Sequence, residues 1–216
     1  MTHINNHIAQ LRTDYAKGQL DESSVEKNPF KQFEKWMHEA IESQLSEANA
    51  MTLATADKNG KPTLRVVLLR EYSEKGFSFY SNYTSKKGTD IAQNPYAALN
   101  FFWIELQRQI RIEGVIEKLS TKESDDYFNS RPHESKIGAW VSEQSQAIKN
   151  RNVLDEKFEA LSKKYLNNDV PRPPYWGGYL LKPTSVEFWQ GRPSRLHDRI
   201  QYTISNNNWL IERLAP

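Results

Sequence analysis

The chain has 216 residues, of which 38% are hydrophobic and 12% aromatic, so it can bury one sizeable core and its aromatic content argues against disorder. It has no cysteine, which excludes disulfides, thiolate zinc sites, iron–sulfur clusters and a cysteine nucleophile. A net charge of +2 predicts no nucleic-acid partner, and the lack of a signal-like start or a long apolar run predicts no membrane span and a cytoplasmic location.

The first 28 residues are polar and charged, and they predict an N-terminal arm ahead of a single domain over residues 29–216. Ile8, Leu11 and Tyr15 recur at helical spacing. Arg12 and Tyr15 are the side chains of this arm that could reach a ligand. A loosely docked helix or a flexible arm without that role is the alternative.

A helix and a strand are predicted next. Asn28 and Pro29 form a good helix start, and apolar residues at three- and four-residue steps carry an amphipathic helix to about Leu45. Residues 50–56 predict a strand that leads into an Asn-Gly turn, which is typical of a β-hairpin.

The return strand of this hairpin spans residues 63–70. Arg65 and Arg70 lie at the two ends of its apolar run, where each is either a snorkelling end group or a ligand for an anion. We expect the strand to be buried on both faces, because its apolar residues do not alternate with polar ones. The run consists of Val66, Val67, Leu68 and Leu69.

A strand at residues 76–81 is followed by a loop and a short helix. Ser85, Lys86 and Lys87 stand at the start of that helix, where free backbone N–H groups and the helix dipole favour an anion. With Arg65 they predict a first phosphate site.

Residues 96–103 and 106–119 predict a second hairpin. Gln109 lies on the polar face of its second strand, where it either hydrogen-bonds a heterocycle or is simply solvated. A capping-box sequence then opens another helix.

Three side chains near the end of this helix predict a second phosphate site. Tyr127, Arg131 and Ser135 follow one another at four-residue steps, so they share one side if the helix persists, although Pro132 predicts a break. A guanidinium fork and two hydroxyls suit a phosphate, and Arg70 is a candidate addition to the set.

An amphipathic helix and a proline-rich linker lead to strands at residues 185–189 and 200–204. If the strand pattern extends between them, period two puts Arg195, His197 and Arg199 on one face. Such a face implies an anionic or electron-rich neighbour, and a solvated edge strand is the alternative.

The whole pattern predicts a mainly β fold with flanking helices. About seven strands with hairpin turns favour an antiparallel barrel, and the lack of a G-x-G-x-x-G motif argues against a Rossmann nucleotide site. Two phosphate sites and an Arg/His/Arg cluster predict two phosphorylated ligands that meet face to face, one a cofactor and the other a substrate.

Several short motifs follow one another along the chain. They are Arg65-Val-Val-Leu-Leu-Arg70, Phe79-Tyr80-Ser81-Asn82, Ser85-Lys86-Lys87, Tyr127-Phe-x-Ser-Arg131-Pro, Ile137-Gly-Ala-Trp-Val-Ser-x-Gln144-Ser145, Trp176-Gly-Gly, Phe188-Trp189-Gln190-Gly191, Arg195-Leu-His197-Asp-Arg199 and Arg213-Leu-Ala-Pro. Together they resemble the pyridoxine (pyridoxamine) 5'-phosphate oxidase family, in the same order from about Arg12 to Pro216. The resemblance implies an FMN-binding split β-barrel that forms a homodimer with FMN at the subunit interface.

The same resemblance implies roles for individual residues and no metal site. It implies catalytic roles for Arg195 and His197 beside the substrate ring, with Arg12 and Tyr15 closing over it as a lid. The implied FMN contacts are Arg65, Val66, Val67, Leu68, Leu69, Arg70, Tyr80, Ser81, Lys86, Lys87, Gln109, Gln144, Ser145, Trp189 and Arg199. The implied substrate contacts are Arg12, Tyr15, Arg70, Tyr127, Arg131, Ser135, Arg195, Leu196 and His197.

Three positions depart from the family pattern. Arg70 stands where lysine is expected, Lys86 where arginine is common and Ser81 where threonine is common. Arg70 keeps the positive charge of a lysine, but it presents a planar guanidinium in place of a compact ammonium group. This change in geometry affects the implied contact between residue 70 and the substrate phosphate.

The implied reaction oxidises pyridoxamine 5'-phosphate and pyridoxine 5'-phosphate to pyridoxal 5'-phosphate. A hydride passes from substrate C4' to flavin N5, and O2 is then reduced to H2O2. Two other classes remain open from the residues: a flavin- or haem-binding split-barrel protein without catalysis, and a structural barrel with solvated charged strands.

Overall fold

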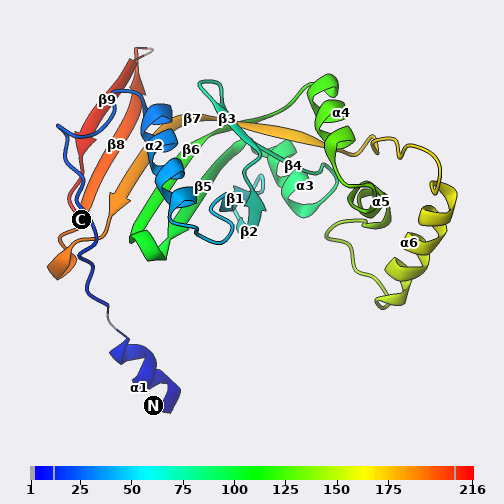
Figure 1. Cartoon of the computed structure of the whole chain (residues 1–216), viewed down its shortest axis with the longest axis horizontal. Helices are drawn as coiled ribbons and strands as arrows, with labels where there is room; N and C mark the ends of the chain where they lie inside the picture. Colours follow the sequence, from blue (N-terminus) through cyan, green and yellow to red (C-terminus); the bar gives the residue numbers. More distant parts are fainter. Residues whose placement is uncertain (1–2, 12, 207) are drawn as a thin grey trace. The chain divides into compact units, whose positions relative to one another are not determined.

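The structure is a computed structural model that describes residues 3–11, 13–206 and 208–216. Figure 1 labels its elements. The helices are α1 (His3–Gln10), α2 (Pro29–Glu42), α3 (Lys86–Gln93), α4 (Thr121–Ser130), α5 (His133–Val141) and α6 (Asn152–Lys164), with 3-10 turns at Ile104–Leu106 and Pro193–Arg195. The strands are β1 (Ala50–Ala56), β2 (Pro62–Leu68), β3 (Glu71–Ser73), β4 (Gly76–Asn82), β5 (Tyr96–Trp103), β6 (Arg108–Lys118), β7 (Trp176–Gln190), β8 (Asp198–Ser205) and β9 (Asn208–Arg213).

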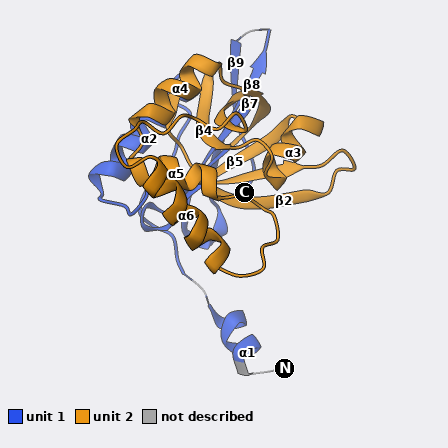
Figure 2. Cartoon of the chain, turned by 90° about the vertical axis from the view of Figure 1, so that its right-hand side faces the viewer, with its two compact units in different colours: residues 1–48, 101–111, 185–216 blue, residues 49–100, 112–184 orange. Residues whose placement is uncertain are grey.

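The chain divides into two compact units, each assembled from separate segments (Figure 2). Unit 1 comprises residues 1–48, 101–111 and 185–216, and unit 2 comprises residues 49–100 and 112–184. Strands β5, β6 and β7 contribute residues to both units.

Nine strands of the described chain form one sheet, in the order β2-β1-β5-β6-β7-β4-β3, with β8 added to β7 and β9 to β8. The pairings of β1 with β2 and β5, of β4 with β3 and β7, and of β8 with β7 and β9 are antiparallel. The predicted mainly β fold with flanking helices is therefore confirmed. The strand count exceeds the prediction mainly because the short β3 and the C-terminal β9 carry little sequence signal.

Helix α2 supplies much of the core of unit 1. Its first turn is capped by Asn28, whose side-chain oxygen accepts a hydrogen bond from the Phe30 N–H at 2.8 Å. The buried face of the helix places Phe33 edge-on to Phe101 and Trp36 edge-on to Phe188. The predicted amphipathic helix is thus confirmed, and it packs by aromatic contacts that also fix β7.

In unit 2, helices α4 and α5 meet at a sharp break. The predicted capping box opens α4: Ser120 Oγ accepts from the Glu123 N–H, and the Glu123 carboxylate accepts from the Ser120 N–H. The helix ends at Ser130, and α5 starts after Pro132, as the proline predicted. Helices α5 and α6 lie side by side around a small core of Ile137, Val141 and Val170 (Figure 1).

One prediction about β2 is wrong. The strand is at the end of the strand order and is not buried on both faces: Leu64 is 69% exposed and Val66 is 67% exposed. The sequence shows only that these residues are apolar. Within the described chain nothing covers them, so an uninterrupted apolar run here marks an exposed face.

None of the helices in the described residues combines the length and hydrophobicity needed to span a membrane. Within residues 3–11, 13–206 and 208–216, no group of three or more histidine and acidic side chains is arranged to hold a metal ion.

Candidate functional site

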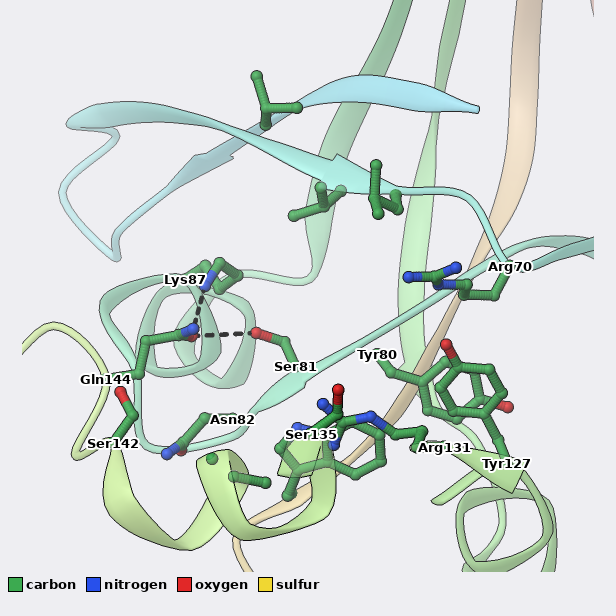
Figure 3. Close-up of a pocket in the computed structure, with 16 residues that line it drawn as sticks. Arg70, Tyr80, Ser81, Asn82, Lys87, Tyr127, Arg131, Ser135, Ser142 and Gln144 are labelled. Carbon is green, nitrogen blue, oxygen red and sulfur yellow. Dashed lines mark hydrogen bonds between the residues drawn. The ribbon is translucent and has the colours of Figure 1, made fainter. Parts of the chain in front are cut away.

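A cavity of about 470 Å³ opens in unit 2, where the end of β2, strand β4 and helices α3, α4 and α5 come together (Figure 3). Among the described residues that line it, none is acidic, and three are cationic. The lining residues are Val66, Val67, Leu68, Arg70, Tyr80, Ser81, Asn82, Lys87, Tyr127, Arg131, Ser135, Gly138, Ala139, Ser142, Gln144 and Trp176.

Arg131 carries the clearest signal in this cavity. Its guanidinium carbon lies 4.6 Å from the centre of the Trp176 ring and 5.5 Å from that of Phe128. Its Nη1 atom is buried and has no hydrogen-bond partner among the described residues. Burial lowers the pKa of Arg131, and the nearby charge of Arg70 adds to this effect. A buried cation with an unused donor is suited to an anionic ligand.

An aromatic wall stands beside this cation. The Tyr80 and Tyr127 rings are stacked with centroids 3.8 Å apart, and Trp176 is nearly parallel to both at 5.6 and 6.2 Å. Burial raises the pKa of Tyr80 to about 12, so its hydroxyl remains a neutral donor. Ser135 lines the same cavity as Tyr127 and Arg131. These three residues therefore come together as predicted, although α4 ends and α5 begins between Tyr127 and Ser135.

The other end of the cavity holds a lysine and an amide. Lys87 Nζ donates to Gln144 Oε1 at 2.7 Å, and Ser81 Oγ donates to the same oxygen at 3.2 Å, as Figure 3 shows. Burial lowers the pKa of Lys87 to about 8, with a smaller contribution from the charge of Arg65. This end therefore offers a second partly desolvated cation.

The predicted first phosphate site is divided in this structure. Arg65 donates to the Leu53 carbonyl at 3.1 Å and to Thr55 Oγ1 at 2.8 Å, and it lies 4.0 Å from the Asp90 carboxylate. Lys86 is also paired with Asp90, a buried group. Neither Arg65 nor Lys86 lines the cavity, whereas Lys87 does.

The remaining predicted FMN contacts lie elsewhere. Leu69 is buried and Ser145 is exposed with a φ of 73°, and neither lines the cavity. Gln109, Trp189 and Arg199 belong to unit 1.

Arg199 already has a carboxylate partner. Its Nε and Nη2 atoms donate to the two oxygens of the buried Glu187 carboxylate, each at 2.9 Å. These hydrogen bonds raise the pKa of Arg199.

A second cavity, of about 580 Å³, lies in unit 1. Tyr15, Arg195 and His197 all line it, so the structure brings together the predicted lid residue and the predicted catalytic pair. The His197 ring lies 4.7 Å from Trp189 and 5.8 Å from Tyr15, between centroids. His197 Nδ1 accepts a hydrogen bond from the Arg192 N–H at 3.1 Å, so a neutral ring carries its proton on Nε2.

The strand predicted through residues 195–199 is wrong in its first half. Strand β8 begins at Asp198, and Arg195 closes a 3-10 turn in which Ser194 and Arg195 have φ values of 57° and 61°. Residues in the left-handed conformation interrupt the alternation of side chains along a strand. The two-residue repeat therefore does not place Arg195 and His197 on the same face. Leu196 is 69% exposed and does not line the cavity. Arg12 lies outside the described residues.

Sequence reasoning assigned no role to several lining residues. Asn82, Ser142 and Trp176 are the polar or aromatic ones, with Gly138 and Ala139 beside them. All five lie inside motifs that carried the family resemblance, and Trp176 begins a Trp-Gly-Gly sequence. The close approach that Gly177 makes to Tyr83 shows why a small residue must follow this tryptophan: an added Cβ would lie 2.1 Å from the Tyr83 hydroxyl.

Comparison with protein families matches most of the chain. The family described as pyridoxamine 5'-phosphate oxidase matches residues 37–165, and the pyridoxine 5'-phosphate oxidase C-terminal dimerisation region matches residues 176–216. Proteins named pyridoxine/pyridoxamine 5'-phosphate oxidase are 52% identical in Cyanothece sp. and 55% identical in Paraburkholderia phymatum. The first alignment covers 97% of this chain and 98% of the relative, and the second covers 97% and 99%.

Two solved structures are similar in fold. PhzG from Burkholderia lata, solved in complex with tetrahydrophenazine-1-carboxylic acid, gives a TM-score of 0.86 at 29% identity, covering 91% of this chain and 98% of that one. A pyridoxamine 5'-phosphate oxidase-related, FMN-binding protein from Nostoc punctiforme gives 0.70 at 18% identity, covering 88% and 98%, and so supports the fold alone. The expected split-barrel fold class is confirmed by these matches.

Proposed function

The chain belongs to the pyridoxamine 5'-phosphate oxidase family, and we propose that it oxidises pyridoxamine and pyridoxine 5'-phosphates to pyridoxal 5'-phosphate. FMN is the cofactor, O2 is the electron acceptor and H2O2 is the second product. The observation that carries this proposal is the unpartnered Nη1 of Arg131, a buried donor beside an aromatic wall in a cavity without acidic lining residues among those described.

The residues of the unit 2 cavity fit a phosphorylated flavin. The volume of about 470 Å³ is in the usual range for cofactor sites, and Lys87, Ser81 and Gln144 offer a cation, a hydroxyl and an amide at one end. Apolar side chains of Val66, Val67 and Leu68 form another part of the wall. When bound, FMN would supply a two-electron acceptor for the hydride from the substrate, with O2 as the final electron acceptor.

The chain's own residues orient the substrate. Arg131, Tyr127 and Ser135 are proposed to hold its phosphate, since a guanidinium and two hydroxyls provide donors at one end of the cavity. Anchoring the phosphate fixes the position of the pyridine ring, which reduces the entropy lost in reaching the reactive geometry. Arg70, which is exposed and 5.9 Å from the Tyr127 ring, is proposed to add a second positive charge here.

Arg195, His197 and Tyr15 are proposed to act on the ring itself. Because Nδ1 of His197 accepts from the Arg192 N–H, Nε2 is the atom that it offers to the oxygen or amine on substrate C4'. Arg195 is proposed to position the ring, and Tyr15, together with Arg12, to cover it as a lid. These roles exclude water from the reacting carbon and hold its substituent in one orientation.

The C-terminal match to a dimerisation region indicates a homodimer. We place FMN at the interface between the two copies as part of the proposal. The exposed apolar face of β2 supports it, since Leu64 and Val66 are each more than two-thirds exposed and Val66 also lines the cavity. A cytoplasmic location stays a prediction from the sequence.

A flavin or haem carrier without catalysis would have no use for Arg131, Tyr127 and Ser135 together, so the oxidase is preferred. The test is direct. Purified protein should be yellow and should release H2O2 in a 1:1 ratio to pyridoxal 5'-phosphate on addition of pyridoxamine 5'-phosphate. A colourless protein that does not bind added FMN would contradict the proposal. A yellow protein that forms no peroxide would identify a carrier.

A further inference from the structure

Gln107 lies in an unusual position in unit 1, immediately before strand β6. It is 7% exposed and has φ and ψ of 54° and 43°, a left-handed conformation that residues other than glycine rarely adopt. Its own N–H donates to the Ile104 carbonyl at 3.0 Å and so closes the 3-10 turn. A buried glutamine kept in a strained conformation indicates a specific task for its side chain.

The side chain of Gln107 holds the N-terminal arm. Its Oε1 accepts hydrogen bonds from two successive backbone N–H groups, that of Ala16 at 2.9 Å and that of Lys17 at 3.1 Å. Lys17 Nζ adds a bond to the Glu105 carbonyl at 2.7 Å. These bonds fix the arm directly after Tyr15, the residue that lines the unit 1 cavity.

The backbone of Gln107 holds the turn that leads to His197. Its carbonyl accepts from the Gly191 N–H at 2.8 Å and from Gln190 Nε2 at 3.2 Å. Gly191 is packed so closely against Tyr15 that an added Cβ would lie 2.8 Å from the Tyr15 Cβ. The arm and the turn are therefore fixed to the same residue from two directions.

We propose that Gln107 is a positioning residue for the reaction: it fixes Tyr15 and the His197 turn relative to each other, and so forms the closed wall of the substrate-ring cavity. The two sides of that wall meet in the edge-on contact of Tyr15 with Trp189, whose centroids are 5.8 Å apart, and in the contact of Trp189 with His197. The hydrogen bonds of Gln107 to the arm and to the turn are called the clamp below. The effect of the clamp on catalysis rests on the proposed oxidase function, whereas the clamp itself does not.

Two substitutions separate the clamp from general effects on folding. Gln107→Asn keeps an amide and suits the left-handed conformation, but its side chain is one carbon shorter and cannot reach both N–H groups. Gln107→Glu keeps the length and the acceptor oxygen. The asparagine variant should therefore lose the clamp and the glutamate variant should retain it.

Limited trypsin digestion of the full chain with FMN added measures the clamp without any need for activity. Cleavage after Lys17 requires the arm to detach, so the fragment that begins at Gly18 should form on the order of tenfold faster in Gln107→Asn than in the wild type. Gln107→Glu should be cleaved at the wild-type rate. Mass spectrometry identifies the fragment.

Steady-state kinetics measure the positioning. In Gln107→Asn, KM for pyridoxamine 5'-phosphate should rise on the order of tenfold, with kcat within about threefold of the wild type, whereas Gln107→Glu should restore KM. Unchanged cleavage in Gln107→Asn, or a Gln107→Glu variant that is cleaved like it, would overturn the clamp. Faster cleavage with an unchanged KM would overturn the positioning role. A wild type without oxidase activity would reject the proposed function and leave the cleavage result to decide on the clamp.

Discussion

The guanidinium carbon of Arg131 lies 4.6 Å from the centre of the Trp176 ring, and its buried Nη1 has no hydrogen-bond partner among the described residues. Trp176 is itself fixed, since its backbone carbonyl accepts from Arg172 Nη1 at 2.6 Å. The indole holds the cation in place by its ring face but gives the N–H groups no acceptor. A phosphate oxygen would supply that acceptor, which is why the pair is central to the proposed substrate site.

Replacing Arg131 by Gln should weaken the enzyme for phosphorylated substrate alone. Loss of charge-assisted hydrogen bonds costs about 1.5–3 kcal/mol, so KM for pyridoxamine 5'-phosphate should rise roughly 10- to 100-fold. Turnover of unphosphorylated pyridoxamine, measured at high concentration, should change little. Arg151→Gln is a matched control, because that side chain, immediately before α6, is 81% exposed and its replacement should leave both substrates unaffected. An equal loss for both substrates in Arg131→Gln would argue against phosphate binding.

Lys87 should make FMN binding depend on pH. Burial lowers the pKa of this group from its ordinary value of 10.5 to about 8, so it is charged below about pH 8 and neutral above it. The dissociation constant of FMN from the apoprotein should therefore rise about tenfold between pH 7 and pH 9.5, as followed by flavin fluorescence. Lys87→Met should bind weakly at both pH values, and a pH step that persists in this variant would assign the titration to another group.

The same shift has a consequence for the stability of the apoprotein. Between about pH 8 and pH 10.5 the unfolded chain binds more protons at Lys87 than the folded chain does, so the contribution of this group to the free energy of unfolding rises with pH over that window. Urea denaturation of the wild type and of Lys87→Met at several pH values isolates this contribution.

Arg195 and His197 should be needed for the chemistry with bound substrate. We expect Arg195→Ala and His197→Ala each to lower kcat/KM for pyridoxamine 5'-phosphate by on the order of 100-fold, because each side chain lines the cavity that is proposed to hold the substrate ring. A rise in KM alone would mark a positioning role. Wild-type kcat/KM in both variants would show that neither contacts the substrate. FMN content, measured by absorbance, verifies that the variants still bind the cofactor.

The exposed face of β2 should be part of the dimer interface. Leu64→Glu places a charge on a side chain that is 69% exposed and does not line the cavity. If a second copy covers this face, the buried charge should shift the protein to monomers in sedimentation velocity, and FMN affinity should fall with it. Thr89→Glu on the exposed surface of α3 is a control for added charge. A dimer that is unaffected by Leu64→Glu would place the interface elsewhere.

Local signals in the sequence predicted several elements and one side of the site. The capping box at Ser120 and the helix start at Asn28 depend on residues within a few positions, so they could be identified without knowledge of the rest of the chain. The spacing of Tyr127, Arg131 and Ser135 predicted that they act together, and they line one cavity even though Pro132 divides the helix.

Other features depend on segments that are distant in the sequence. Asp90 on α3 lies 4.0 Å from Arg65 on β2, and no spacing rule predicts this pair because the two residues belong to separate elements. Lys86 pairs with the same carboxylate at the i,i+4 spacing of a helix, so that contact is local. The apolar run of β2 predicted burial, but whether a strand is central or at an edge depends on the order in which all strands pair.

By itself, the sequence determined the kinds of chemistry available to this protein: two candidate sets of phosphate-binding residues, an Arg/His pair and a mainly β fold. The tertiary structure decided which cations remain without a carboxylate partner, that left-handed residues at 194 and 195 interrupt the expected strand, and that Gln107 binds both the arm and the turn. The physical reason is that residue type and spacing specify donors, charges and local conformation. The hydrogen-bond partner of each group is decided only when segments as far as 193 positions apart come into contact.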